Sequence, residues 1–516
     1  MHSFRKLTTL TVLIGILVFV GPWIPSLMQI VGFGHAAIAQ TNSGSPRRSD
    51  DTWQVIYIGG KRIGYTRTST RIESKGGEDL VQTENETFMT IKRFGQELKI
   101  QTILNTQETN QGDLLGFEFE MKNPPRASLT RTVGRVDENT LVLESTVAGK
   151  KTKKTQPWNK EIKSPAYQDR LLRNRSIKPG ATWSFKMFLP ELNKDTTVKI
   201  VADEMQRVKL LDGREQELLK VHITQSILPT ITTRAYLDVR GNTLKSESNF
   251  LGTSMITYTV SKDVALEAIA GAELDIAVNT LVRVTPIKHA HRTRKVVYHI
   301  TTPGDDPSKY LVAGVTQSLK KTGADSVEVT VIAVKPPKIT RTVQPELEYL
   351  TATRYLQSRD RRVVEHATLA SAGETEPIKI ARRMERYVHE KLEEKNFSTA
   401  LASAAEVATN LEGDCTEHAV LLAAMLRVKK IASRIAVGMV YIRSHSSFGG
   451  HMWTEAYLGG TWIPLDATLG QGGIGAGHIK FSQSSFADNA AAPVMTFLPL
   501  LNVLGKMGIE VVQVEH

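Results

Sequence analysis

Apolar residues first gather near the start of the chain, directly behind a short basic segment. Arg5 and Lys6 precede an apolar run at residues 7–20, and Ala37-Ile38-Ala39 follows some twenty residues later. This succession of a basic start, an apolar run and a small-residue pattern is typical of export signals that are cleaved after the small residues. We therefore predict that residues 1–39 form an export signal.

An uncleaved membrane anchor is the alternative for the same segment. The first apolar run is shorter than the about 20 residues that cross a bilayer. The apolar residues at 7–31 taken together are long enough for an anchor. Both interpretations predict an extracytoplasmic protein, either periplasmic or secreted, or anchored to a membrane by residues 7–31.

After a polar linker at residues 40–51, the pattern at 52–280 changes to short alternating runs that are typical of β-strands. The first two runs, Gln54–Ile58 and Arg62–Thr66, flank Gly59-Gly60, which predicts a hairpin. Further β-like runs occupy residues 86–93, 97–103, 115–121, 140–145, 197–202, 218–224 and 232–239. These lengths and spacings predict a large antiparallel sheet or sandwich. Since no nucleophile–base pair occurs there, we expect a structural or binding role.

A smaller α/β segment is predicted at residues 281–345, with strands at Lys295–Thr301 and Val327–Val334. His289 and His291 lie among basic residues, so we interpret them as part of a solvated basic face rather than as ligands. A helical apolar stripe begins after Thr375, inside the predicted catalytic domain at 346–483. A C-terminal tail is predicted at 484–516, and its apolar part from Pro493 to His516 is predicted to pack on the domain as a helix, with a partner or membrane contact as the alternative.

Composition and charge narrow the class of protein. The 516 residues are 41 % hydrophobic and 23 % charged, which is typical of globular proteins, and the length predicts several domains. The net charge of +12 favours anionic partners. Because no zinc-finger spacing or aromatic-basic strand motif is present, we expect no nucleic-acid partner. The lysine-rich residues 150–154 are predicted to form a solvated loop.

The single cysteine stands at the start of a predicted helix. Leu411 to Arg427 reads LEGDCTEHAVLLAAMLR, in which Asp414 and Glu417 form a capping-box pattern before a long apolar run. This makes Asp414 the N-cap and Cys415 the first helical residue. Unpaired N–H groups at a helix start favour thiolate over thiol and could stabilise an oxyanion. A small buried core residue is the alternative interpretation of Cys415.

A histidine and an aspartate are brought together by a second predicted hairpin. The segment GHMWTEAYL ends at Leu458, Gly459-Gly460 forms the turn, and TWIPLD ends at Asp466. A two-residue turn places Trp453 opposite Asp466, so His451 and Asp466 become diagonal neighbours on one face, roughly 7 Å apart between backbones. An aspartate beside an imidazole fixes its tautomer and stabilises the imidazolium.

At these residues the chain resembles the transglutaminase-like superfamily. The blocks GDCTEHAVLLAAML, SRIAVGMVYI and GGHMWTEAYLGGTWIPLDATLG resemble its three motif blocks in chain order. The resemblance covers roughly Tyr349 to Gln483. It implies a papain-like arrangement of helices and sheet, with Cys415 as nucleophile, His451 as general base and Asp466 as its orienting partner.

Three features depart from the family pattern or leave it incomplete. Ala467 follows the aspartate where proline is usual, and Lys429 to Ala432 stands in place of a Gly-Ile-Pro turn. No tryptophan lies between Trp183 and Trp453, so a tryptophan donor to the oxyanion is excluded for that stretch. The backbone N–H of Cys415 is the oxyanion donor that we name.

Overall, the sequence predicts a multidomain α+β protein with a largely antiparallel N-terminal β region and a C-terminal transglutaminase-like domain. The expected function is that of a cysteine enzyme that acts on amide bonds through a thioester. Hydrolysis, as in a peptidase or amidase, is favoured over transfer to an amine, and the substrate is a protein, a peptide or a cell-wall polymer.

Three alternatives remain open. A non-catalytic adaptor on the same fold is the main rival. His418, one helical turn after Cys415, is either a second base or a supporting core residue. Zinc bound by Cys415, His418 and His451 is the metal alternative, but the enzyme interpretation needs no cofactor or metal.

Overall fold

The computed structural model describes residues 49–516, except 76–77, 94–95, 124–125, 148, 174–176, 270–279, 335–344, 393–400, 472–473 and 490–492. The predicted signal or anchor at 1–39 lies outside the described residues. Within the described part, no helix combines the length and the apolar character needed to cross a bilayer. The chain divides near residue 275 into two compact units, which are described separately.

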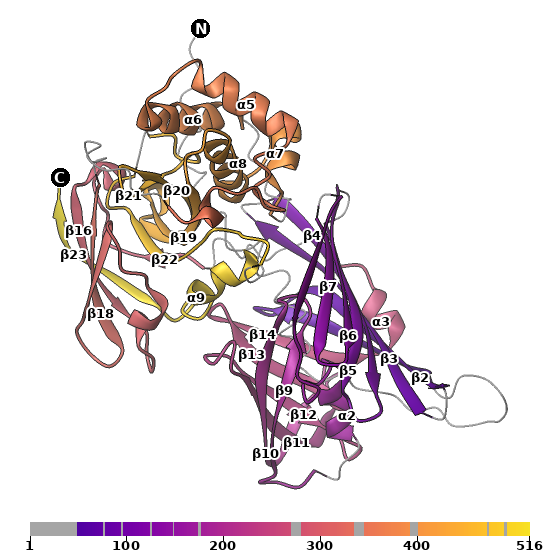
Figure 1. Cartoon of the computed structure of the whole chain (residues 1–516). Helices are drawn as coiled ribbons and strands as arrows, with labels where there is room; N and C mark the ends of the chain where they lie inside the picture. The colour runs from indigo at the N-terminus through magenta and orange to yellow at the C-terminus, as the bar shows by residue number, and fades with distance from the viewer. Residues whose placement is uncertain are drawn as a thin grey trace. The chain divides into compact units, whose positions relative to one another are not determined.

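The N-terminal unit is one antiparallel sheet of 14 strands, which confirms the predicted β region (Figure 1). The strand order runs from β8 to β1 and then from β14 back to β9, so two meanders meet where β1 pairs with β14. The strands are β1 (Ser49–Ile58), β2 (Lys61–Lys75), β3 (Glu78–Arg93), β4 (Gln96–Thr109), β5 (Leu114–Asn123), β6 (Arg126–Asp137), β7 (Thr140–Val147), β8 (Lys150–Pro157), β9 (Thr182–Leu189), β10 (Lys194–Lys209), β11 (Glu215–Gln225), β12 (Thr232–Leu237), β13 (Thr243–Phe250) and β14 (Thr253–Val260). Two short helices, α2 (Tyr167–Arg173) and α3 (Lys262–Leu266), accompany the sheet.

The first hairpin forms as predicted, because both glycines adopt the positive φ that its turn requires. Gly59 has φ 58° and Gly60 has φ 78°, and Ile58 pairs with Lys61. The polar linker predicted at 40–51 is too long, since β1 already begins at Ser49.

The lysine-rich segment at 150–154 is a strand and not the predicted loop. It belongs to β8, the edge strand at one end of the sheet, and Lys151 and Lys153 are exposed. Charged lysines on an edge strand discourage pairing with another chain, so the segment suits an edge as well as it suits a loop.

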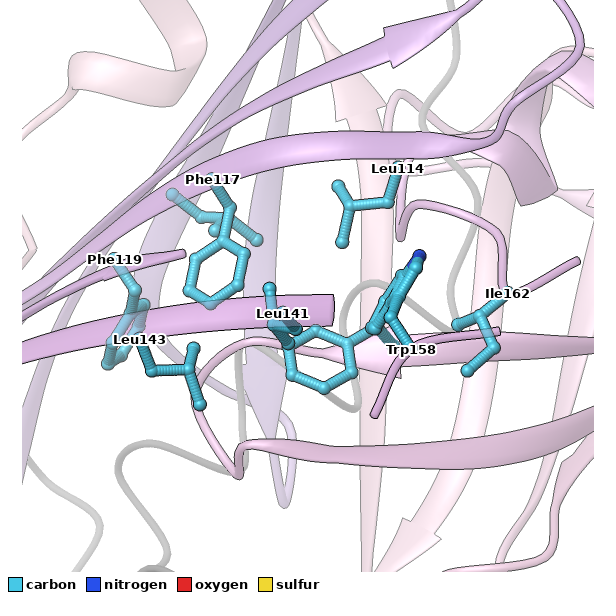
Figure 2. Packing of buried hydrophobic residues seen from close by; sticks show 9 residues of the cluster. Leu114, Phe117, Phe119, Leu141, Leu143, Trp158 and Ile162 are labelled. Atoms are coloured by element: carbon cyan, nitrogen blue, oxygen red, sulfur yellow. The ribbon is translucent and has the colours of Figure 1, made fainter. Parts of the chain in front are cut away.

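A buried apolar cluster joins the two ends of this sheet. Phe117 on β5 and Trp158 after β8 both pack against Phe188 on β9, with ring centroids 5.5 Å and 5.3 Å apart. Figure 2 shows Phe117 and Trp158 beside Leu141 of β7, and Phe188 belongs to the same buried cluster. The sheet therefore curls so that the residue that follows its end strand β8 packs in one core with a residue of its other end strand, β9.

The C-terminal unit contains two further sheets and the helices that cover one of them (Figure 1). The first sheet has the order β15-β20-β19-β22, and β21 also pairs with β20. Its strands are β15 (Val282–Arg283), β19 (Ser433–Ile442), β20 (Ser447–Leu458), β21 (Thr461–Leu465) and β22 (His478–Ser484). The helices are α5 (Arg361–Ser371), α6 (Pro377–Lys391), α7 (Ala404–Asn410) and α8 (Cys415–Val428). Helix α8 is buried on all sides because it packs against α5, α6, α7 and the sheet.

The other sheet unites the predicted small segment with the C-terminal tail. Its order is β17 (Gln317–Lys321), β18 (Ser326–Ile332), β16 (Lys295–Thr301) and β23 (Gly508–Glu515). The strands predicted near 295–301 and 327–334 are confirmed, whereas the helical turns described in this segment are of the 3-10 type. The prediction of a helical tail is wrong at its end, because among the described residues from Pro493 onward a 3-10 turn and α9 (Leu498–Leu501) are followed by β23.

Candidate active site

Cys415 is the first residue of α8, as the capping pattern predicts. The Asp414 side chain accepts the backbone N–H of Thr416 at 2.8 Å, and the Glu417 side chain accepts the backbone N–H of Asp414 at 3.0 Å. Gly413 precedes them with φ 144°, and a Cβ there would lie 2.3 Å from the Glu417 Cβ, so only glycine fits. The thiol is fully buried. The capping bonds therefore fix the backbone of Cys415 at the helix start.

His451 and Asp466 form the pair that the second hairpin predicts. Leu458 faces Thr461 and Thr454 faces Leu465, so Asp466 comes directly after β21. Nε2 of His451 lies 2.8 Å from Oδ2 of Asp466, and both side chains are buried. Burial alone would raise the pKa of Asp466, but the imidazoles beside it hold that pKa well below its usual range. Asp466 is therefore a carboxylate that orients His451.

The strand that carries His451 packs against the helix that carries Cys415. The Thr454 hydroxyl of β20 donates to the carbonyl oxygen of Ala419 on α8 at 2.8 Å. Thr454 is three residues from His451 and Ala419 is four residues from Cys415, so this bond ties the strand to the helix near both candidate residues. Nδ1 of His451 has no hydrogen-bond partner among the described residues. Since Nε2 is occupied by Asp466, Nδ1 is the nitrogen that can accept a proton.

Two residues of this site were missed at the level of sequence. His478, at the start of β22, places Nε2 3.0 Å from the same Oδ2 of Asp466. Glu385 on α6 accepts the backbone N–H of Asp466 at 2.9 Å and is fully buried. Glu385 lies within the buried apolar stripe of its helix. A charged residue in such a stripe is the sequence signal that indicates a buried polar contact.

Other histidines near the site have supporting roles. Nδ1 of His418 donates to the carbonyl oxygen of Asp414 at 2.6 Å, which supports the helix start. His291 was predicted to be solvated, but its Nε2 donates to the carbonyl oxygen of Tyr441 and its ring packs on His478 with centroids 5.6 Å apart. The solvated interpretation is thus wrong for His291, although Arg292 beside it is exposed.

The residues that lie close enough together to bind a metal differ from those of the predicted zinc site. Potential ligand atoms of His451, Asp466 and His478 lie within 4.8 Å of one another, whereas the predicted set was Cys415, His418 and His451. Within the described residues, Nδ1 of His451 and Nδ1 of His478 both lack an acceptor. Histidines that bind a metal through one nitrogen normally donate the other N–H to an acceptor. The contacts with Asp466 therefore fit hydrogen bonds better than a metal centre.

The two carboxyl groups at the start of α8 predict a pH-dependent stability. Burial and the negative charge of Asp414 raise the pKa of Glu417 to about 8. An unfolded glutamate has a pKa of about 4.3, so between these values the folded state binds more protons than the unfolded state. The free energy of unfolding is therefore expected to decrease as the pH rises from about 5 to about 8.

Glu417→Gln, which cannot ionise, should remove this part of the pH dependence in urea unfolding followed at several pH values. Glu365→Gln, on the exposed side of α5, is the control and should keep the slope of the wild type. A Glu417→Gln variant with an unchanged slope would show that Glu417 does not hold this proton.

The three sequence blocks are matched by a family model. A model of the transglutaminase-like superfamily matches residues 365–467, which contain Cys415, His451 and Asp466, so the resemblance seen in the sequence is confirmed. No curated protein matches the chain.

Three solved structures are similar to parts of the chain. The first is a beta-barrel-like protein of a domain of unknown function from Brucella abortus, at 11 % identity over 42 % of this chain and 98 % of that chain, with a TM-score of 0.31. The second is a "putative cysteine protease" from Cytophaga hutchinsonii, at 17 % identity over 43 % and 86 %, with a TM-score of 0.26. The third is a "putative protease" from Parabacteroides distasonis, at 11 % identity over 66 % and 64 %, with a TM-score of 0.20.

Proposed function

We propose that the transglutaminase-like domain of this chain is a cysteine enzyme that cleaves amide bonds through a thioester on Cys415. One observation carries this proposal. The buried hydrogen bond between His451 and Asp466 leaves Nδ1 of His451 without a partner in the described part of the chain, on a strand that packs against the helix of Cys415. A base oriented in this way is what a thiol nucleophile needs.

In the proposed reaction, Nδ1 of His451 takes the thiol proton and the thiolate of Cys415 attacks the amide carbonyl. The backbone N–H of Cys415, at the positive end of α8, stabilises the oxyanion. The imidazolium then protonates the leaving amine, and the C–N bond breaks to give the thioester. His451 next deprotonates the acceptor, which attacks the thioester and releases the thiolate.

Water is the acceptor that we propose, which makes the protein a peptidase or amidase. An amine acceptor would give a transamidase by the same steps, because both acceptors lose a proton to His451. We further propose an extracytoplasmic location and a protein, peptide or cell-wall polymer as substrate. Mass spectrometry of products formed with and without an added primary amine separates the two reactions, since only transfer adds the mass of the amine.

The rate of Cys415 alkylation against pH tests the activated thiol. We expect an apparent thiol pKa well below the model value of about 8.5 in the wild type, and loss of this depression in His451→Ala. A small reagent such as iodoacetamide is needed because the thiol is buried. Alkylation of the unfolded chain in urea gives the intrinsic rate. A thiol that titrates identically in both folded proteins would favour the adaptor alternative.

A further inference from the structure

Asp466 has two imidazole partners rather than one. Its Oδ2 accepts from Nε2 of His451 at 2.8 Å and from Nε2 of His478 at 3.0 Å. Its Oδ1 accepts the backbone N–H groups of Thr468 at 2.9 Å and Leu469 at 3.2 Å. Because the backbone N–H groups occupy Oδ1, both histidines donate to the same oxygen, Oδ2.

His478 is held at this oxygen as a buried neutral donor. Its side chain is 1 % exposed, and burial lowers its pKa although Asp466 acts in the opposite direction. Nδ1 of His478 has no hydrogen-bond partner among the residues that the structure describes. A neutral imidazole carries one N–H, and the contact with Asp466 places that N–H on Nε2.

The charged and titratable groups around His478 are few. His451 of β20 and Asp466 lie on one side, with ring centroids of the two histidines 5.7 Å apart. His291 packs on the ring from the segment before β16. Lys480, two residues along β22, is paired with Glu455. The carboxylate of Asp466 is therefore the acidic partner of His478 among the described residues.

From these contacts we propose that His478 is a positioning residue that moderates the basicity of His451. Because His478 donates to Oδ2, this oxygen is a weaker hydrogen-bond acceptor for His451. Asp466 therefore stabilises the imidazolium of His451 less than it would without His478. This inference rests on the proposed function for its catalytic meaning, but the hydrogen-bond coupling can be measured without any substrate.

The test is a pH titration of His451 in the full-length chain, followed by NMR of histidines labelled at Cε1. Cys415→Ala is the background, so that the thiol does not contribute, and His451→Gln assigns the resonance among the 13 histidines. In His478→Leu we expect the pKa of His451 to rise by about one unit, because a carboxylate with one donor fewer stabilises the imidazolium more strongly. His478→Gln keeps an N–H donor near the position of Nε2 and should leave the pKa of His451 close to the background value.

His389→Leu is the matched control, because it removes a contact with the loop that follows Asp466 but leaves the carboxylate of Asp466 untouched. Its Nδ1 donates to the carbonyl oxygen of Ala467 at 3.0 Å without touching the Asp466 carboxylate. This variant should leave the pKa of His451 unchanged. His478→Phe supplies a second side chain without a donor if leucine destabilises the fold.

Equal His451 pKa values in the donor-free variants and in the background would overturn the proposal. So would a rise in His389→Leu as large as that in His478→Leu, because the effect would then come from the loop. Failure of the proposed function is recognised separately, as an inert wild-type thiol. In that case a raised His451 pKa in His478→Leu would still establish the coupling.

Discussion

Asp466→Asn is expected to lower the rate of acyl-enzyme formation in the proposed reaction by about 10³- to 10⁴-fold. Thr468 and Leu469 donate to Oδ1, so the amide oxygen of an asparagine would stay there. The amide NH₂ would then face Nε2 of His451 and force the other tautomer, with the proton on Nδ1. In that tautomer His451 cannot take the proton of Cys415.

The burst of p-nitrophenol released from a small activated ester measures this step, with Cys415→Ala as the baseline. Asp360→Asn is the matched control, because Asp360 caps α5 away from the site and asparagine caps a helix about as well. It should retain the wild-type burst. A loss of less than about tenfold in Asp466→Asn would mean that Asp466 does not set the tautomer.

Glu455→Leu is expected to destabilise the C-terminal unit by about 3–5 kcal/mol. The Glu455 side chain is 2 % exposed and binds Nε of Arg434 at 2.7 Å and Nζ of Lys480 at 3.0 Å. The Arg434 guanidinium also lies 4.1 Å from the ring centroid of Trp462. Removing the carboxylate would leave two buried cations without their anion, which costs far more than the lost contact itself.

Urea unfolding of the full-length chain, followed by the fluorescence of its tryptophans, measures this effect. Glu365→Leu, in an exposed ion pair on α5, should change the free energy of unfolding by no more than about 0.5 kcal/mol. Replacing Arg434 and Lys480 by methionine together with Glu455→Leu should cost less than Glu455→Leu alone, because no buried charge is then left unpaired. Equal stability of Glu455→Leu and the wild type would show that Glu455 does not stabilise the two buried cations.

The parts of the site that the sequence predicts depend on short-range geometry. Asp414 and Glu417 cap α8 through residues no more than three positions apart. The Gly459-Gly460 turn fixes the pairing of β20 with β21, and with it the approach of Asp466 to His451. Such contacts are determined by turn chemistry and strand periodicity, which a sequence displays directly.

Residues that come from distant strands were predicted less well. β22 follows β21 in the chain, yet it pairs with β19, and this order brings His478 to Asp466. β23 pairs with β16 across more than 200 residues, so a tail expected to be helical completes a sheet. His291 turns inward because the carbonyl of Tyr441, 150 positions later, receives its N–H.

The sequence by itself determined the three catalytic candidates, Cys415, His451 and Asp466, and the local structure that presents each of them. The tertiary structure decided which further groups share Asp466 and how the segments before and after the domain join one unit. The physical reason is that strand order depends on which apolar faces pack together over the whole unit. Alternation and turn residues fix a hairpin, but they leave the choice of its next neighbour to that packing.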